Sequence, residues 1–370
     1  MAVPRWLLCA SALATLCLGT RGAAAQDALT GPLTLKDSGS FFVGGQLTQT
    51  DAISTNPKGP AGFGYSNSDF ITTDQMYVQF EVPKNTAGKI PVVMIHGCCL
   101  TAKSWEDTPD GRMGWYEYFV RKNHAVYLPD QSSRARSGFD ATPINDVALG
   151  LKPASSLPAI FTFGRNSAWD LFRFGAHYPL VWPDEQFPVE AINEFSKQVI
   201  PDLNATLPTP NPTFANLAQT AVLAGGAVVV GHSESGFFPE QAALANSAGI
   251  RGMISIEGGC PVLNDGQVAS LSKIPVLFIF GDHLDGSDIS APLWTGNVAA
   301  CQTVTKQINA AGGNATFWEL PKLGLHGNSH MLMMDRNNLQ IADMILSWIQ
   351  TNVNQRHGQP LVGKNRALPG

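Results

Sequence analysis

Charged residues are scarce in this sequence, and its basic residues never gather into a run. Asp, Glu, Lys and Arg make up 14% of the 370 residues, and the formal net charge is -5. Nucleic acids and anionic membrane surfaces are bound through clustered positive charge, so neither is expected as the main partner. Apolar residues make up 44% of the chain. This content excludes a disordered or fibrous protein and allows a sizeable core.

A hydrophobic run long enough to cross a membrane is also missing. The apolar stretch from Trp6 to Gly19 spans 14 residues, whereas a transmembrane helix needs about 20. The stretch follows Arg5 and leads to Ala23-Ala24-Ala25, which is the form of a secretory signal. Neither Cys9 nor Cys17 follows the small residues that a lipid-anchored signal needs. We therefore expect a secreted or periplasmic protein without a membrane anchor.

Cleavage after Ala25 would leave residues 26–370 as a single domain. The mature chain keeps four cysteines, Cys98, Cys99, Cys260 and Cys301, in a compartment where disulfides persist. Four cysteines permit three pairings. Adjacent cysteines bridge only through a strained eight-membered ring. The residues alone therefore leave three possibilities open: Cys98–Cys99 together with Cys260–Cys301, crossed pairs, or free buried thiols.

The chain alternates short apolar runs with amphipathic stretches. This order predicts an α/β fold with a mostly parallel central sheet flanked by helices. The expected strands are residues 75–82, 90–95, 125–128, 227–230, 253–256 and 276–280, and the expected helices are residues 115–122, 237–246, 304–311 and 338–353.

Residues 131–212 break this rhythm with Pro, Trp and Phe and with one expected helix near residues 189–199. A connection of this length in a compact domain usually carries function. We interpret it as a cap that is inserted before the nucleophile strand and covers the site with apolar and aromatic side chains. The alternative is a structural satellite that does not contact the substrate.

A sharp turn with serine at its apex follows the apolar run of residues 227–230. The segment Gly231-His232-Ser233-Glu234-Ser235-Gly236 is typical of a nucleophile elbow, in which the backbone holds the serine in a strained conformation between a strand and a helix. Ser235 stands where the usual pattern has its second glycine. We expect Ser233 to be the nucleophile; a buried serine at a helix cap is the alternative.

A serine hydroxyl becomes nucleophilic when an imidazole accepts its proton. His326 and His330 both lie after the last expected strand and before the last helix, where this fold carries its base. His330 is favoured because the loop before it delivers it directly ahead of the helix. His326 then has a hydrogen-bonding role in the loop.

The acid that orients the imidazole should follow a sheet strand, and two carboxylates do so. Glu257 directly follows the apolar run at residues 253–256, and Asp282 follows the run at residues 276–280. Strand counting favours Asp282, which ends the seventh strand if Ser233 follows the fifth. Glu257 is favoured by the Gly258-Gly259-Cys260 loop behind it, which a disulfide would stiffen.

Two backbone amides must stabilise the negative charge that develops on the carbonyl oxygen of the ester. The residue after the nucleophile, Glu234, offers one of them. The other is expected from Cys98, because His96-Gly97 forms a turn after the strand at residues 90–95. A zinc or redox pair at Cys98 and Cys99 is disfavoured, since they lack a Cys-x-x-Cys spacing and nearby ligands.

The paired motifs resemble secreted bacterial α/β-hydrolase esterases, whose oxyanion loop reads H-G-C-C and whose elbow reads G-H-S-x-S-G. The resemblance covers about residues 35–355. It implies Glu257 as the acid, Cys98 and Glu234 as the amide donors, and a Cys98–Cys99 disulfide beside the oxyanion hole, which leaves Cys260 to pair with Cys301. It further implies activity on carboxylic esters and pairing into a homodimer.

These observations predict a serine hydrolase that cleaves small-molecule esters through an acyl-enzyme, with no cofactor. A lactone, amide or carbon–carbon bond hydrolase of the same fold would show the same triad. A non-catalytic binding protein of this fold is disfavoured because serine, histidine and acid are all present. Metal dependence through Asp282, His283, Asp285 and Asp288 is disfavoured, since the segment lacks a calcium-loop pattern.

Overall fold

Eight strands form one sheet at the centre of the molecule. The computed structural model describes residues 29–55, 68–86 and 88–353, so the expected signal at residues 1–25 lies outside the described part. The strand order is β1-β4-β6-β5-β7-β8-β9-β10. β4 pairs antiparallel with β1 and β6, and each later pair in this order is parallel. The predicted α/β fold with a mostly parallel sheet is confirmed. The strands are β1 (Leu35–Val43), β4 (Met76–Pro83), β5 (Val92–Ile95), β6 (Val126–Pro129), β7 (Ala227–His232), β8 (Ile250–Ile256), β9 (Val276–Phe280) and β10 (Ala315–Glu319).

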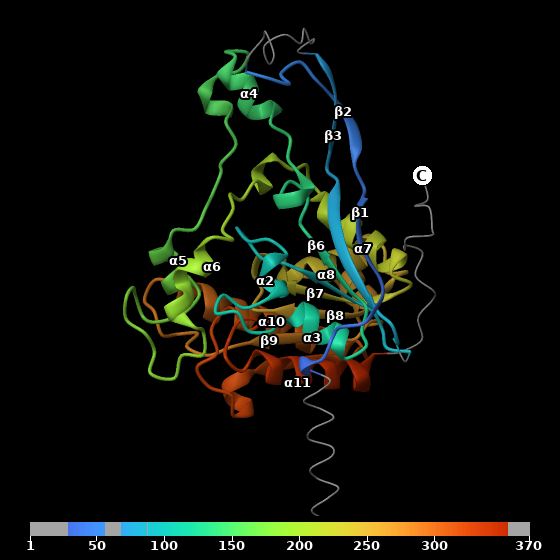
Figure 1. The fold of residues 1–370 in the computed structure, drawn as a ribbon, viewed down its shortest axis with the longest axis vertical. Helices are drawn as coiled ribbons and strands as arrows, with labels where there is room; N and C mark the ends of the chain where they lie inside the picture. The colour runs from blue at the N-terminus through green and yellow to red at the C-terminus, as the bar shows by residue number, and fades with distance from the viewer. Residues whose placement is uncertain (1–28, 56–67, 87, 354–370) are drawn as a thin grey trace, which may run out of the picture.

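Apolar runs without alternation become the inner strands because both faces of the sheet are covered. In β5, Val92 and Met94 join one apolar cluster, and Val93 and Ile95 join the other. The first cluster lies under α3 and α11, whereas α7, α8 and α10 contribute to the second (Figure 1). The main helices are α2 (Lys103–Glu106), α3 (Trp115–Arg121), α7 (Pro212–Leu223), α8 (Phe238–Ala245), α9 (Asp265–Leu271), α10 (Ala291–Ala310) and α11 (Asn338–Asn352).

Several elements differ from the sequence expectation. α10 begins at Ala291 and ends at Ala310, whereas the apolar spacing indicated a helix only from residue 304. Few residues in its first half are buried, so the apolar stripe that reveals a helix is weak there. α7 begins where the insertion was expected to end, with Asn211 accepting a hydrogen bond from the Thr213 amide at 2.9 Å.

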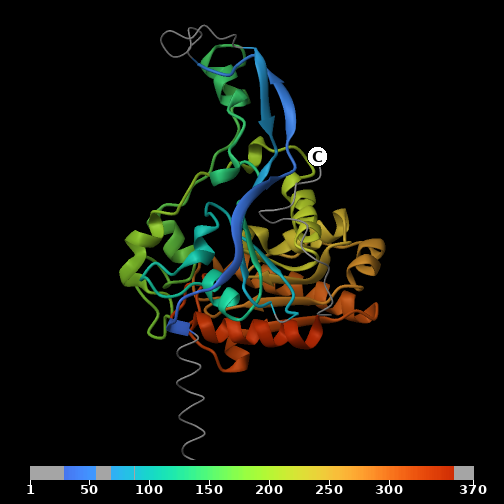
Figure 2. The same cartoon turned by 45° about the vertical axis from the view of Figure 1, so that its right-hand side comes forward.

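A small second sheet projects from the body. It pairs β2 (Gln46–Thr50) with β3 (Asp69–Thr73), and both lie beside α4 (Thr142–Ala148) at the far end of the molecule (Figures 1 and 2). The chain bends between β1 and β2 at Gly44 and Gly45, whose φ angles are 65° and 96°. Those angles lie in the left-handed region that glycine tolerates without a steric cost.

The stretch between β6 and β7 carries more helix than the one element expected. Its Pro-rich sequence breaks the helices into short pieces separated by 3₁₀ turns. Its second half places a cluster of aromatic rings, including Phe172, Phe174, Phe187 and Phe195, in the main core. The pieces are η1 (Ala135–Ser137), α4, η2 (Ala154–Ser156), α5 (Arg165–Leu171), η3 (Val189–Ala191), α6 (Ile192–Ser196) and η4 (Asn204–Thr206).

A disulfide joins the loop after β8 to α10. Cys260 and Cys301 are bonded, with Cα atoms 5.0 Å apart and a sequence separation of 41. The bond fixes the loop that follows Glu257. None of the helices within the described residues has the length and apolar character that a membrane span requires.

Candidate active site

The elbow at Ser233 has the strained geometry that its sequence predicts. Ser233 follows β7 directly and has φ 57°, a left-handed angle that is costly for a residue with a side chain. Gly231 is required just before it, because an added Cβ atom would lie 1.9 Å from the Ser235 carbonyl oxygen. The sharp turn lifts the Ser233 hydroxyl to the carboxyl edge of the sheet.

His330 links the serine to a carboxylate. Its Nε2 atom lies 2.8 Å from Ser233 Oγ, and its Nδ1 atom lies 3.2 Å from Glu257 Oε2. Both His330 and Glu257 are fully buried. The three side chains come from positions after β7, after β8 and before α11, and they form one continuous hydrogen-bonded chain.

His326 and Asp282, the alternative base and acid, contact each other and not the Ser233–His330–Glu257 chain. His326 is 62% exposed, and its Nδ1 atom lies 3.4 Å from Asp282 Oδ2. Asp282 also accepts a hydrogen bond from the Gly327 amide at 3.0 Å. Asp282 therefore shapes the loop that leads to His330, while Glu257 contacts the His330 ring itself.

A buried carboxylate organises the loop that carries His330. Asp335 accepts hydrogen bonds from the Ser329 amide at 3.0 Å, the Ser329 hydroxyl at 2.6 Å and the Asn328 side chain at 2.9 Å. Burial raises the pKa of Asp335 to about 7, although these hydrogen bonds oppose the shift. Motif reasoning missed this residue, because its partners become neighbours only when the loop folds.

Glu257 stays ionised despite its burial. Burial alone would raise the pKa of this carboxyl, but the charge of Arg173 and the contact with His330 outweigh it and lower the pKa to about 2. The Glu257 Oε1 atom accepts hydrogen bonds from Arg173 Nη2 at 2.7 Å and from the Gly281 amide. For His330, burial lowers the pKa while Glu257 opposes the shift, which favours a neutral imidazole.

The loop expected to supply an oxyanion amide packs directly on Ser233. A Cβ atom at Gly97 would lie 2.6 Å from the Cβ atom of Ser233. Ser235 ties the two segments together, since its hydroxyl donates to the His96 carbonyl at 2.7 Å and accepts from Gln131 Nε2 at 2.9 Å. The serine that replaces the usual glycine is therefore a cross-link between the elbow and this loop.

A buried arginine holds Glu234, the residue after Ser233. Arg134 donates from Nη1 to Glu234 Oε2 at 2.8 Å and from Nη2 to Glu234 Oε1 at 3.1 Å. Its side chain is fully buried and also pairs with Asp202. These contacts fix the peptide that presents the Glu234 amide.

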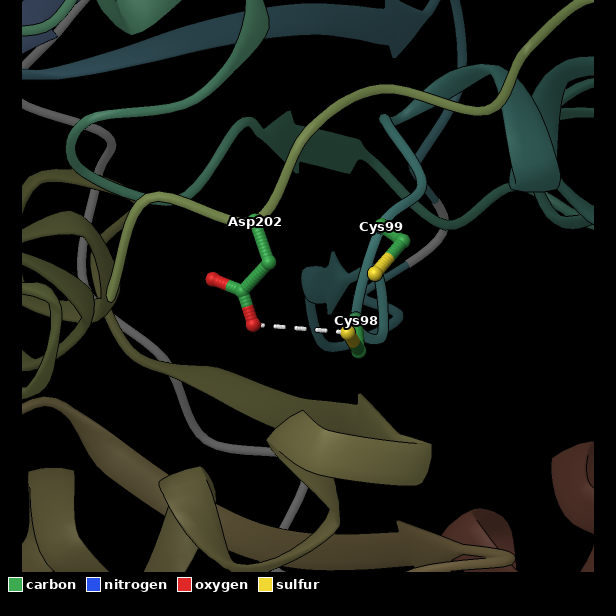
Figure 3. Close-up of side chains that lie close together, drawn as sticks. All are labelled: Cys98, Cys99 and Asp202. Carbon is green, nitrogen blue, oxygen red and sulfur yellow. Dashed lines mark hydrogen bonds between the residues drawn. The ribbon is translucent and has the colours of Figure 1, made fainter. Parts of the chain in front are cut away.

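The bond expected between the adjacent cysteines is not formed. Cys98 and Cys99 are both free cysteines. Figure 3 shows the Cys98 sulfur turned toward Asp202, and its Sγ atom lies 3.4 Å from Asp202 Oδ2. The Cys98 thiol thus has a polar partner in another segment, and no strained eight-membered ring is formed. The other expected pair, Cys260–Cys301, is present.

Aromatic rings enclose the imidazole on two sides. The Phe172 ring stacks on His330 with centroids 5.1 Å apart, and the Trp294 ring lies 4.5 Å away. Phe172 belongs to the segment between β6 and β7, and its carbonyl accepts the His330 amide at 3.0 Å. This segment therefore packs directly on His330.

Two groups of side chains offer possible metal ligands among the described residues. One is Cys98, Cys99 and Asp202, and the other is Asp184, Asp282 and His283. In the second group, His283 Nε2 lies 2.9 Å from Asp184 Oδ1, and the His283 ring stacks on Trp182. Asp285 and Asp288, which the sequence analysis also considered, do not join either group.

Known proteins resemble this chain over most of its length. No model of a known protein family matches the sequence. A solved structure described as a novel bacterial esterase is 48% identical, with a TM-score of 0.81, and the match covers 87% of this chain and 98% of that one. The probable secreted lipase phiG of Fungal sp. (strain ATCC 74256) is 26% identical over 319 residues, covering 74% of this chain and 85% of the lipase. The chain belongs to the esterase and lipase-like family of the α/β-hydrolase fold.

Proposed function

We propose that this protein, a carboxylic ester hydrolase by family and fold, works through a covalent acyl-enzyme on Ser233. His330 is the general base and acid, and Glu257 orients and stabilises the imidazolium. The observation that carries the proposal is the continuous chain from Ser233 Oγ to His330 Nε2 at 2.8 Å and from His330 Nδ1 to Glu257 Oε2 at 3.2 Å. Base, nucleophile and orienting acid lie within the distances that this chemistry needs.

The first half of the reaction forms the acyl-enzyme. Ser233 Oγ attacks the ester carbonyl carbon while His330 Nε2 takes the hydroxyl proton. The negative charge that develops on the carbonyl oxygen meets the amides of Glu234 and Cys98, which we assign as the oxyanion hole. The tetrahedral intermediate collapses, and His330 returns the proton to the departing alcohol.

The second half releases the acid. A water molecule loses a proton to His330 Nε2 and attacks the acyl carbon. The bond from that carbon to Ser233 Oγ then breaks as His330 returns the proton to Oγ. Glu257 stabilises the imidazolium in both halves. No step of this sequence calls for a cofactor.

The substrate is proposed to be a small-molecule ester held against aromatic walls. The buried rings of Phe172 and Trp294 flank the imidazole, so the surroundings of the base are apolar, as is typical of sites that bind apolar groups. Export is proposed from the signal-like residues 1–25 and from the likeness to a protein named a probable secreted lipase. A homodimer remains a proposal that rests on the resemblance of the motifs.

Pre-steady-state kinetics test the proposed acyl-enzyme. Mixed rapidly with excess p-nitrophenyl acetate, the mature enzyme is expected to release nitrophenol in a burst, followed by a slower steady rate, since water must then cleave the acyl group. Acid-quenched protein taken during the burst should carry an acetyl group on the peptide containing Ser233. An acetyl group on a different residue during turnover would contradict this assignment of the nucleophile.

A further inference from the structure

Arg173 is a buried charge that the proposed reaction leaves without a role. It follows α5, has φ 62°, and lies in the segment inserted between β6 and β7. Only 1% of its surface is exposed. A buried guanidinium is costly unless it is paired and hydrogen-bonded, so its partners indicate why the chain keeps it there.

The guanidinium of Arg173 joins the triad acid to the neighbouring strand end. Its Nη2 atom donates to Glu257 Oε1 at 2.7 Å, and its Nε atom donates to the Asp282 carbonyl at 2.7 Å. The same group lies 4.9 Å over the Trp294 ring. Glu257 thus uses one oxygen for Arg173 and the other for His330, which fixes its rotation.

The residue before Arg173 fixes the other member of the pair. The Phe172 carbonyl accepts the His330 amide at 3.0 Å, and the Phe172 ring stacks on the imidazole. Two consecutive residues of the inserted segment therefore contact the base and the acid.

We propose that Arg173 is a positioning residue for hydrolysis, acting through Glu257 to keep that carboxylate anionic and aimed at His330 Nδ1. The inference rests on the proposed function of the Ser233–His330–Glu257 chain and deepens it. It also gives the inserted segment a second role, since the segment supplies a charge to the catalytic centre as well as walls for the substrate.

Arg173 is the nearest cation to the His330–Glu257 pair. The His232 ring lies beside His330 and contacts the His330 carbonyl through Nε2 at 2.9 Å, but burial lowers the pKa of His232 to about 3 and keeps it neutral. The charge of Glu257 contributes to the raised pKa of Asp335, which lies below the His330 loop. Glu185, whose pKa burial raises to about 9, also faces Arg173. Loss of the Arg173 charge then favours proton uptake by the His330–Glu257 pair, whichever member binds the proton.

The test compares Arg173→Gln, which loses the charge, with Arg173→Lys, which keeps it. The pH dependence of kcat/KM for a neutral acetate ester is measured in a pH-stat, with competent sites counted by phosphonate titration. In Arg173→Gln we expect the acid limb to move upward by about one pH unit and kcat/KM at pH 8 to fall roughly 100-fold, mostly in kcat. In Arg173→Lys we expect the limb to stay in place and the loss to be roughly tenfold, because a lysine cannot make both hydrogen bonds. Arg165→Gln, an exposed arginine at the start of α5, is the matched control and should behave as wild type.

The inference is overturned if the acid limb of kcat/KM does not move in an Arg173→Gln variant that is folded and reacts with the phosphonate. It is also overturned if the limb moves equally in Arg173→Lys. If the glutamine variant does not fold, Arg173→Lys alone decides, since a displaced limb there excludes a role through charge. Ser233→Ala, assayed in parallel, separates the two hypotheses. Full activity in that variant rejects the proposed function, whereas an inactive Ser233→Ala beside an unchanged Arg173→Gln rejects the role of Arg173 alone.

Discussion

Ser233→Ala is expected to lower kcat for p-nitrophenyl acetate by roughly 10⁴- to 10⁶-fold, and His330→Ala by a similar factor. The two residues act as one unit, because the hydroxyl attacks only when Nε2 accepts its proton across the 2.8 Å contact. The double variant should therefore be no slower than the poorer single variant. Initial rates at saturating substrate, with folding checked by circular dichroism, measure this effect.

His326→Ala provides the matched control for the histidine. It removes an imidazole four residues away from His330. The His326 side chain is 62% exposed, and its ionisable partner is Asp282. Its kcat should stay within about threefold of wild type, as expected for a surface substitution away from the reacting atoms. A large loss in His326→Ala with near-normal His330→Ala would exchange the roles of the two residues.

Glu257→Gln is expected to lower kcat by roughly 10³- to 10⁴-fold. The amide of glutamine can donate a hydrogen bond to His330 Nδ1, which favours the tautomer whose Nε2 carries the proton. That tautomer cannot accept the Ser233 proton. The variant also leaves Arg173 without its anionic partner, so thermal unfolding should be recorded to separate lost stability from lost rate.

Asp282→Asn is the matched control for the acid. Asp282 carries a carboxylate after the next strand, and it contacts the Gly327 amide and His326 but not His330. We expect a loss in kcat of no more than about fivefold, since the loop loses one charge-assisted hydrogen bond. If Asp282→Asn loses far more activity than Glu257→Gln, the acid has been assigned to the wrong strand.

The sequence predicts the elbow well because its determinants are local. Gly231, Ser233 and the apolar run of β7 lie within a few residues of one another, and a strand–turn–helix is all that the motif requires. The inner strands are equally predictable, since strands buried on both faces must be apolar throughout. The edge strand β10 was not expected, as each of its residues is only partly buried.

Long-range partners set the limit of the sequence reasoning. Choosing between Glu257 and Asp282 depends on which strand end faces His330, and no local spacing reports that direction. Arg173 was missed for the same reason, although a single charge within the apolar segment Phe172-Arg173-Phe174 is a signal, because a buried charge demands a partner. The adjacent cysteines show a further limit: the family resemblance implied a bond between them, but the Cys98 thiol faces Asp202 instead.

The most direct test of the central claim is the residue that a fluorophosphonate modifies in the native enzyme. The account predicts one phosphonyl group per chain, located by mass spectrometry on Ser233, with hydrolysis lost in proportion to labelling and no label in Ser233→Ala. Labelling at another residue, or complete ester hydrolysis by an enzyme fully labelled at Ser233, would contradict it.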